Sequence, residues 1–364
     1  MLAPTYTIPD LPPGVDLETV PVLKALAAAN RALAELKGRA ASIPNQGILI
    51  DTLALQEAKA SSEIENIVTT QDELFQSELL LEGPDSPAAK EVALYRDALK
   101  LGHDRLIETD GLILNRTLIE MFQLLKRHQG GFRTTPGTTL RNEATGEAVY
   151  VPPQEAGRIE AHMAALESFI NDDAACNLDP LIKMTLIHHQ FESIHPFPDG
   201  NGRIGRILNV LYLNRTGLLE IPILYLSRYI TETKADYYRL LQHVRDHGEW
   251  EPWVLYMLEA VAQTARTTLA LVEGVRSQMA EMKRLIRTER PNLYSQDLLN
   301  NLFRHPYTRI EFVVADLRVT RQTAAKYLDS LADTGIVVKH QAGRSNYYIN
   351  VNLVRLFLDV SGER

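Results

Sequence analysis

The sequence HPFPDGNGRIGR, residues 195–206, lies between two apolar stretches, LIKMTLIHHQFESI at 181–194 and ILNVLYLNRTG at 207–217. Both flanking stretches show the spacing of buried helices. A connection between two buried helices needs only a chain reversal, yet this one holds a histidine, an acid, three glycines and two arginines. The sequence therefore predicts a site with its own chemistry at this connection.

The two helices beside this loop are predicted from the residues at their ends. Asp179 followed by Pro180 is typical of an N-cap and a first helical position, and Pro196 ends that helix at about 194. The run at 202–214 is again apolar and periodic, and Gly217 closes it. Further helices are predicted at 20–38, 88–102 and 116–131, each ending at a glycine. The fold class is therefore mainly α.

The glycines and arginines of the loop favour binding of a polyphosphate. A helix N-terminus presents unpaired N–H groups and a partial positive charge, and Gly200, Asn201 and Gly202 lie just before one. Arg203 and Arg206 are three positions apart, so both reach the same face. Two guanidinium groups at the positive end of a helix are unfavourable unless an anion lies between them.

The acid and the histidine complete the expected chemistry. Asp199 alone would repel a phosphate, but it fits the site if Mg²⁺ bridges the two. His195, at the end of the preceding helix, is free to act as a base toward a hydroxyl group.

Other interpretations of the same residues are rejected. GNGRIG at 200–205 matches G-x-G-x-x-G, but a dinucleotide fingerprint needs a β-strand before the glycines, and here a helix and two prolines precede them. The chain contains neither a P-loop motif nor H-E-x-x-H. His188 and His189 fall within a helix and are expected in the core rather than as metal ligands.

Residues 195–206 fit every position of the Fic motif, H-x-F-x-[DE]-G-N-G-R-x-x-R, and the chain therefore resembles the Fic family. Fic proteins are helical enzymes, most of which transfer AMP from ATP to a protein hydroxyl. The resemblance implies that His195 deprotonates the target hydroxyl, Phe197 anchors the loop and Asp199 holds Mg²⁺. It assigns the phosphate contacts to Gly200, Asn201, Gly202, Arg203, Ile204, Gly205 and Arg206.

A hairpin is predicted within TTPGTTLRNEATGEAVYVPP, residues 134–153, where NEATG supplies the turn. On sequence alone, a surface hairpin without a function explains this segment equally well. The resemblance implies a flap, in which Val149, Tyr150 and Val151 dock a target segment by strand addition.

A second resemblance lies in SSEIEN, residues 61–66, which fits the inhibitory motif [ST]-x-x-x-E-[GN] of the family, with Asn66 at the last position. Without the Fic motif, Glu65 would be an ordinary exposed acid on a helix. With it, the resemblance implies that Glu65, in a motif begun by Ser61, pairs with Arg206 and takes the place of the γ-phosphate. Tyr238, in ADYYRLL, is expected to line the adenine side of the pocket.

The last 69 residues differ from the rest, because they carry a net charge of +2 while the chain carries −8. Three short helices followed by two strands are predicted, the order of a winged helix–turn–helix. Thr320 is the expected N-cap, and Ala325, Leu328 and Leu331 the expected apolar face. Arg321, Gln322 and Lys326 point outward on the same helix. We expect this face to bind either DNA or a protein. A second copy of this chain, in a homodimer, is one such protein.

Composition narrows the remaining classes. The chain has 364 residues, 45% of them hydrophobic, and its acidic balance disfavours binding of nucleic acid or a membrane by the whole chain. One cysteine, Cys176, and a first stretch without signal-peptide features predict a cytoplasmic location. The expected domains are 1–105 with the inhibitory motif, 106–260 as catalytic core, 261–295 as helical linker and 296–364 as winged helix.

Two functions follow from these patterns. The first is a protein adenylyltransferase that transfers AMP from ATP to a Ser, Thr or Tyr hydroxyl of a target protein, itself included, releases pyrophosphate and is inhibited by Glu65. The second is a DNA-binding transcription regulator whose catalytically idle Fic core senses nucleotide. An intact His195 and Asp199 favour the first, because a sensor needs phosphate contacts but no base. Removal of AMP from a target stays open.

Overall fold

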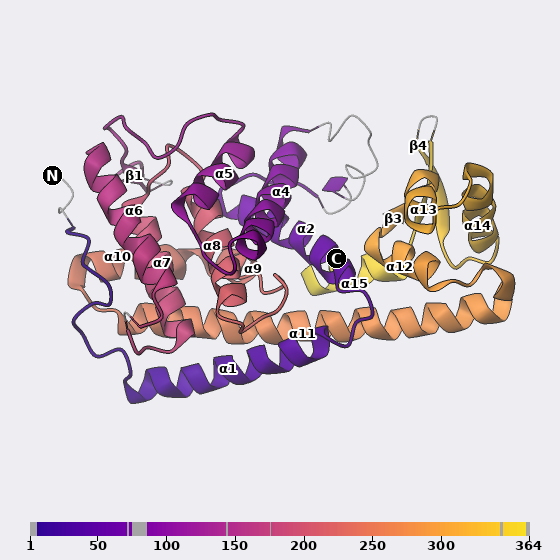
Figure 1. Cartoon of the computed structure of the whole chain (residues 1–364), viewed down its shortest axis with the longest axis horizontal. Coiled ribbons are helices and arrows are strands. Elements are labelled where there is room, and N and C mark those ends of the chain that lie inside the picture. The colour runs from indigo at the N-terminus through magenta and orange to yellow at the C-terminus, as the bar shows by residue number, and fades with distance from the viewer. Residues whose placement is uncertain are drawn as a thin grey trace.

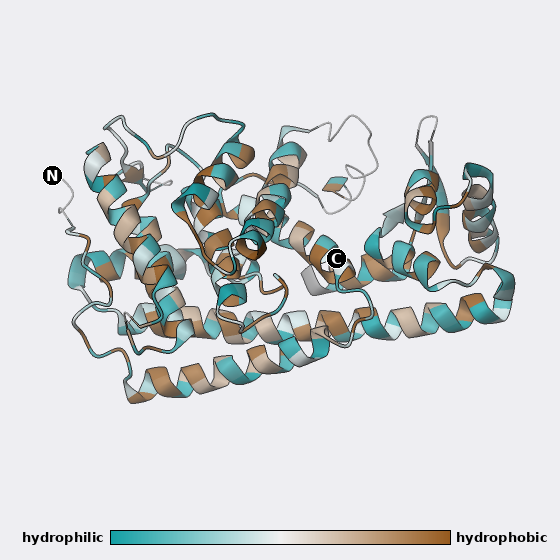
Figure 2. Cartoon of the chain, viewed as in Figure 1, coloured by the Kyte–Doolittle hydropathy of each residue, from teal (hydrophilic) through white to brown (hydrophobic). Residues whose placement is uncertain are grey.

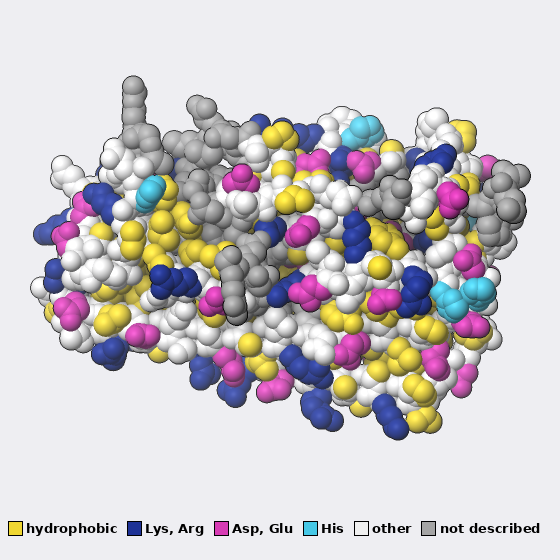
Figure 3. Space-filling model, turned by 180° about the vertical axis from the view of Figure 1, so that it is seen from behind, with side chains coloured by type: hydrophobic (Ala, Val, Ile, Leu, Met, Phe, Trp, Pro, Cys, Tyr) yellow, Lys and Arg dark blue, Asp and Glu magenta, His cyan; other side chains and the backbone are white. Residues whose placement is uncertain are grey.

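The computed structural model describes residues 6–70, 73–74, 86–142, 145–174, 176–342 and 345–361. It is mainly helical, as the sequence predicts, and has one two-stranded and one three-stranded antiparallel sheet (Figure 1). Among these residues no helix is long and apolar enough to cross a bilayer. The face seen in Figure 3 mixes acidic and basic side chains rather than separating them.

Two long helices run side by side along the molecule, α1 (Val20–Ala40) and α11 (Glu251–Glu289) (Figure 1). Hydrophobic and hydrophilic residues alternate along both, as expected for helices buried on one side (Figure 2). The prediction that α1 ends at Gly38 is wrong, since the helix continues through it to Ala40. Helix α11 is unbroken for 39 residues and passes through the expected boundary between core and linker at residue 260.

The centre of the molecule is formed by α7 (Pro180–Ile194) and α8 (Asn201–Arg215). Both helices lie where the sequence places them, and most of their side chains are buried. Asp179 caps α7 as predicted, because its Oδ1 accepts a hydrogen bond of 2.8 Å from the backbone N–H of Leu181. Helix α8 contacts α2 (Gly47–Ile64), α4 (Pro87–Glu108) and α5 (Asn115–Lys126), and α7 contacts α6 (Ala156–Asn171) and α11. Helix α9 (Ser227–Glu232) packs on α2, and α10 (Lys234–His247) packs on α11.

The glycines that were expected to end the helices at 88–102 and 116–131 do not end them. Gly102 does not end α4 but lies inside it, where an added Cβ would come within 2.5 Å of the Met121 sulfur. Its missing side chain lets α4 and α5 approach closely. Helix α5 ends at Arg127, whose backbone is left-handed (φ 50°), before the glycines at 130–131.

The predicted hairpin is present as β1 (Leu140–Arg141) and β2 (Ala148–Tyr150), paired antiparallel. Leu140 lies opposite Tyr150, and Gly146 adopts φ 71° in the turn. A positive φ is unfavourable for most residues with a Cβ, which explains glycine at this position.

The three predicted helices and the two strands after them are present in the C-terminal region, but a short strand that was not predicted, β3 (Tyr307–Thr308), lies between the first two helices. In order, the elements are α12 (Gln296–Arg304), β3, α13 (Ile310–Leu317), α14 (Arg321–Asp333), β4 (Val338–Ala342) and β5 (Ser345–Ile349), with a sheet order β3–β5–β4. Thr320 caps α14 as predicted. The apolar face of α14 is Ala324, Leu328 and Leu331, so the prediction of Ala325 is off by one position. Helix α15 (Val351–Ser361) packs back against α11.

Candidate active site

The loop between α7 and α8 is held by left-handed residues at its two ends and by the side chain of Asn201. His195 ends α7 in a left-handed conformation (φ 48°), and Gly200 begins α8 with φ 77°. Asn201 clamps the turn, because its Oδ1 accepts a hydrogen bond from the N–H of Phe197 and its Nδ2 donates one to the Phe197 carbonyl, both 2.8 Å long. The first N–H groups of α8 therefore stay available to a ligand.

Phe197 and Arg133 hold this loop against the core. Phe197 is fully buried and stacks on Phe122 with ring centroids 4.5 Å apart, as the anchoring function expected of it requires. Arg133, itself buried, donates from Nε to the His195 carbonyl at 2.8 Å and from its backbone N–H to the Pro196 carbonyl at 2.8 Å. Sequence reasoning missed Arg133, because an isolated arginine in a loop carries no pattern that identifies its partners.

His195 is held as a neutral imidazole. Burial, together with the positive charges of Arg245 and Arg133, lowers its pKa to about 3. An unprotonated imidazole is the form that accepts a proton, so the geometry keeps His195 ready to act as a base at neutral pH. Its side chain nevertheless remains partly exposed to solvent.

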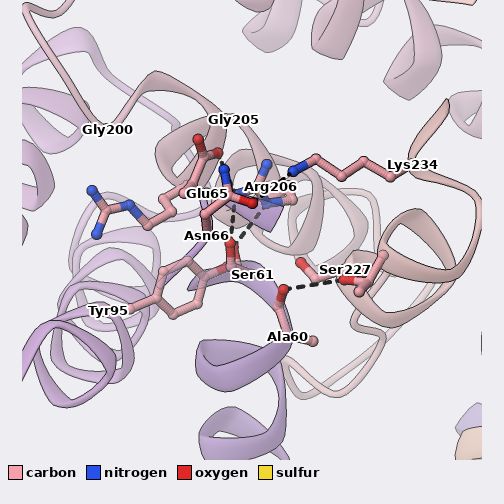
Figure 4. Close-up of polar contacts among 12 residues, drawn as sticks. Ala60, Ser61, Glu65, Asn66, Tyr95, Gly200, Gly205, Arg206, Ser227 and Lys234 are labelled. Atoms are coloured by element: carbon pink, nitrogen blue, oxygen red, sulfur yellow. Dashed lines mark hydrogen bonds and ion pairs between the residues drawn. The ribbon is translucent and has the colours of Figure 1, made fainter. Parts of the chain in front are cut away.

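Arg206 contacts two residues of the SSEIEN segment (Figure 4). Its Nε donates to Ser61 Oγ at 2.8 Å, while Nη2 donates to the Ser61 carbonyl at 2.9 Å and to Glu65 Oε1 at 2.9 Å. Only 2% of the Arg206 side chain is exposed. Burial alone would lower the pKa of Arg206, but the charge of Glu65 outweighs it and raises that pKa above its usual value.

The backbone next to the ion pair between Arg206 and Glu65 leaves little room for other side chains at positions 202 and 66. An added Cβ on Gly202 would come within 2.5 Å of Glu65 Oε1 and within 2.9 Å of Arg206 Nη1. Asn66 has φ 60°, a left-handed conformation that asparagine tolerates better than other residues with a Cβ. Glu65 therefore lies directly over the start of α8. The left-handed conformation explains why the position after Glu65 takes asparagine or glycine in the motif.

Arg203 is not open to the loop as the sequence suggests. Its side chain is 2% exposed, and Nη1 donates to Glu91 Oε2 on α4 at 2.8 Å. The same Glu91 lies 3.5 Å from Lys126 Nζ, which is 2.7 Å from Asp199 Oδ2. A chain of alternating charges thus connects Arg203 with Asp199, and Glu91 and Lys126 in it were not anticipated.

Asp199 is the residue that fits a divalent cation. Partial burial raises its pKa, but the hydrogen bond and the charge of Lys126 outweigh that effect and keep the pKa below its usual value. Nowhere in the described ranges do three His, Cys, Asp or Glu side chains gather to hold a metal. Mg²⁺ bound with nucleotides commonly uses one or two carboxylates together with the phosphates, and Asp199 would supply one such carboxylate.

Two buried carboxyl groups lie close to Arg206 and were not predicted. Glu192 and Glu57 are 8% and 1% exposed, and burial raises the pKa of each to about 7. Gly205 is required beside Glu192, because an added Cβ would approach Glu192 Oε1 to 2.6 Å. His188 is in the core as expected, with Nε2 2.8 Å from the hydroxyl of Tyr237.

The remaining candidate residues are spread over three regions. In the hairpin, Val151 is 36% exposed, whereas Tyr150 is buried and donates its hydroxyl proton to the Ser193 carbonyl at 2.8 Å. Tyr150 thus anchors the hairpin to the core rather than forming part of its open edge. Tyr238 on α10 is 45% exposed. On α14, Arg321, Gln322 and Lys326 are exposed as predicted, and Arg321 pairs with Glu311.

The fold and the loop together define a helical protein in which the N-terminus of α8 lies beside a neutral histidine. Residues 110–213 match the Fic/DOC family, and residues 23–104 match the N-terminal region of that family. Residues 278–353 match the C-terminal domain described as protein adenylyltransferase SoFic-like. The chain therefore carries a Fic domain with the family's N-terminal region before it.

Curated relatives share part of the chain. A 137-residue segment is 30% identical to a protein named protein adenylyltransferase fic-1 from Caenorhabditis briggsae and covers 37% of this chain. A 151-residue segment is 27% identical to protein adenylyltransferase Fic from Drosophila virilis and covers 42% of this chain. These segments span only 24% and 30% of the relatives' own lengths.

Solved structures confirm the fold. A Fic family protein from Desulfovibrio desulfuricans superposes with a TM-score of 0.57 at 21% identity, over 91% of this chain and 96% of that one. Fic-1 from Caenorhabditis elegans gives a TM-score of 0.52 at 20% identity, over 69% of this chain and 74% of that one.

Proposed function

We propose that the protein is an adenylyltransferase that transfers AMP from ATP to a hydroxyl group of a target protein and, in the state described, is inhibited by Glu65. The observation that supports this most directly is the pairing of Arg206 with Glu65 at the start of α8, beside the neutral His195. A phosphate site occupied by a carboxylate of the same chain, with the base ready beside it, is the arrangement of a restrained enzyme.

The proposed reaction is one displacement at the α-phosphorus. The oxygen of a Ser, Thr or Tyr side chain forms the new P–O bond, the bond between the α-phosphorus and the bridging oxygen breaks, and pyrophosphate leaves. His195 takes the proton of the attacking hydroxyl. Asn201 and Arg133 contribute by fixing the loop backbone, so that the base and the helix N-terminus keep their relative position.

The triphosphate is expected over the start of α8. The N–H groups following Gly200 and the guanidinium of Arg206 supply its contacts once Glu65 has left. Asp199 would hold Mg²⁺, and the ion would supply positive charge against the negative charge of the leaving pyrophosphate. Because Asp199 now pairs with Lys126, nucleotide binding must also separate those two side chains.

Inhibition follows because Glu65 and the γ-phosphate of ATP compete for the guanidinium group of Arg206. Arg206 cannot fully pair with both Glu65 and a γ-phosphate, so ATP that enters beside Glu65 has its triphosphate misdirected. Misplacement of the reacting atoms by about 1 Å can cost on the order of 10²-fold in rate. Inhibition therefore does not require a blocked pocket.

The test offers ATP labelled at the α- or the γ-phosphate to the wild type and to Glu65→Gly. We expect α-label alone to enter the protein or a lysate target, with a strong increase for Glu65→Gly. The double variant Glu65→Gly/Arg206→Ala should be as inactive as Arg206→Ala, since the acid acts through that arginine. Transfer of γ-label would refute AMP transfer, and equal rates for wild type and Glu65→Gly would refute the inhibition.

A further inference from the structure

Lys126, the last residue of α5, supplies a positive charge directly beside Asp199. Its Nζ lies 2.7 Å from Asp199 Oδ2 and 3.5 Å from Glu91 Oε1 on α4. The ammonium group therefore lies between two carboxylates, close to the first and at a longer distance from the second. Neither Lys126 nor Glu91 belongs to the loop at 195–206 or to the SSEIEN segment.

The stem of Lys126 is packed, whereas its charged end is near solvent. An added Cβ on Gly200 would lie 3.5 Å from Lys126 Cδ and 3.7 Å from Cγ, so the aliphatic chain lies against the backbone that begins α8. The Lys126 side chain is 21% exposed, and that of Asp199 is 65% exposed. A lysine can bury its stem while its charged end remains in water. The ammonium group can therefore change partner by rotation of its terminal bonds, without movement of α5.

Glu91 is a fixed second partner for this ammonium group. Its Oε2 accepts a hydrogen bond of 2.8 Å from Nη1 of Arg203, whose side chain is 2% exposed. Its Oε1 is 3.5 Å from Lys126 Nζ, which is longer than a strong hydrogen bond. Once Lys126 leaves Asp199, its three N–H donors can approach Glu91 more closely.

Lys126 and a divalent cation compete for the same carboxylate. Asp199 is the residue proposed above to hold Mg²⁺, and its Oδ2 is the atom that Lys126 contacts. Two cations on one carboxylate repel each other, and the repulsion is stronger near a protein than in bulk water. Binding of the ion at Asp199 therefore requires the ammonium group to move away.

We infer that Lys126 is a positioning residue, a built-in counter-ion of Asp199 that moves to Glu91 when Asp199 binds Mg²⁺. Before the ion binds, Lys126 neutralises Asp199 and holds it at the loop. Because a cation of the chain has to be displaced, Asp199 alone binds the metal weakly, and the phosphates of ATP supply the remaining attraction. This coupling of metal binding to nucleotide binding rests on the proposed function.

Metal binding is tested first, without nucleotide and without any activity. Mn²⁺, which uses the same oxygen ligands as Mg²⁺, is titrated into the full chain, and the free ion is measured by electron paramagnetic resonance. Lys126→Met removes the charge and keeps an unbranched stem, whereas Lys126→Arg keeps a charge. Arg127→Met, which removes an exposed cation at the next position, is the matched control.

We expect Lys126→Met to bind Mn²⁺ about fivefold or more tightly than the wild type, whereas Lys126→Arg and Arg127→Met keep the weak binding of the wild type. In the Asp199→Asn background, Lys126→Met should change nothing, because the contested carboxylate is gone. The inference is overturned if Lys126→Met leaves the affinity unchanged, if Arg127→Met gains as much, or if the gain persists without Asp199.

The movement to Glu91 is tested by a double-mutant cycle. Glu91→Gln deprives Lys126 of its second partner, so Mn²⁺ affinity should fall several-fold when Lys126 is present and change much less in the Lys126→Met background. Glu91→Asp, which keeps a negative charge near Arg203 but shortens the reach to Lys126, is measured in the same way, and circular dichroism verifies that each variant is folded. An equal fall in both backgrounds refutes the movement.

The link to catalysis is tested separately. In the Glu65→Gly background, Lys126→Met should lower the Mg²⁺ concentration that gives half-maximal AMP transfer several-fold, with little change in the rate at saturating Mg²⁺. A lower rate at saturation with an unchanged half-maximal concentration would place Lys126 on the phosphates and overturn the inference. If no variant transfers AMP, the proposed function fails, while the Mn²⁺ titrations still decide whether Lys126 is the counter-ion.

Discussion

At the scale of single residues, the charges around His195 explain its chemistry better than its sequence position does. Arg133 touches the backbone of the loop, and Arg245 is half-buried with its guanidinium 4.2 Å from the Tyr150 ring. Burial disfavours the charged imidazole most, and a third positive charge beside these two cations is also unfavourable, so the imidazole stays neutral. The loop thereby obtains a proton acceptor without a carboxylate to orient it.

Replacing this base should separate chemistry from binding. For His195→Ala in the Glu65→Gly background, we expect AMP transfer to fall by roughly 10²–10⁴-fold, as is usual for loss of a general base. ATP affinity should change little, because the phosphate contacts come from α8. Labelled transfer and calorimetry measure the two quantities. His162→Ala on α6 is the control, and a His195→Ala protein with undiminished transfer would rule out the proposed base.

At the scale of elements, the end of α2 decides where Glu65 lies. The helix ends at Ile64, Glu65 is its C-cap, and the left-handed Asn66 turns the chain immediately afterwards. Asn66 Oδ1 also accepts a hydrogen bond from Lys234 Nζ at 3.3 Å. The position of the acid is therefore set by a backbone conformation as well as by its ion pair.

Two substitutions of Asn66 test this conformation. Both Asn66→Gly and Asn66→Val remove the contact with Lys234, but only valine, branched at Cβ, strongly resists a positive φ. We expect Asn66→Gly to keep the low automodification of the wild type and Asn66→Val to raise it several-fold. Equal rates for the two variants would show that the side chain, and not the turn, matters.

The elements that the sequence predicts well are those whose information is local. Helices α7 and α8 and their loop follow from caps, prolines and a continuous motif. Gly38 and Gly102 were wrongly expected to end helices, because whether glycine ends a helix or permits close packing depends on distant residues such as Met121. The partners of the charged residues, among them Glu91 for Arg203, are set by tertiary contacts between helices far apart in sequence.

At the scale of the whole molecule, buried ionisable groups predict how stability depends on pH. Burial lowers the pKa of six histidines, and the shift is large at four of them, His188, His189, His195 and His305. Each stabilises the fold fully above its unfolded pKa of about 6.5 and loses that contribution as the pH falls toward its folded value. Glu57 and Glu192, with pKa values raised to about 7, act in the opposite direction, because the fold keeps their protons.

Since the histidines outnumber these two acids, the free energy of unfolding should fall between pH 6.5 and 5.5, by on the order of 1–3 kcal/mol. Urea unfolding at pH 7.5, 6.5 and 5.5 measures it. Glu192→Gln removes one of the opposing groups and should make the fall steeper. A stability that rises on acidification to pH 5.5 would contradict these burial effects.

The C-terminal region is joined to the inhibitory helix through one carboxylate. Asp51 of α2 pairs with Arg304 Nε of α12 at 2.6 Å and with Lys100 Nζ of α4 at 2.5 Å. Burial raises the pKa of Asp51, but these two cations outweigh it and hold the pKa below its usual value. Any displacement of α12 by a partner of the C-terminal region would therefore act on the helix that ends at Glu65.

Loosening this connection should weaken inhibition without touching the catalytic loop. We expect Arg304→Ala to raise automodification a few-fold, because α2 then has one contact fewer to hold it, whereas Arg304→Ala in the Glu65→Gly background should change nothing. Arg284→Ala, an exposed arginine of α11, is the control. If Arg304→Ala alters both backgrounds equally, its effect comes from stability or chemistry rather than from the position of α2. If Arg304→Ala changes automodification in neither background, the C-terminal region is not coupled to the inhibitory helix. The ion pair would then hold the two surfaces together without transmitting motion between them.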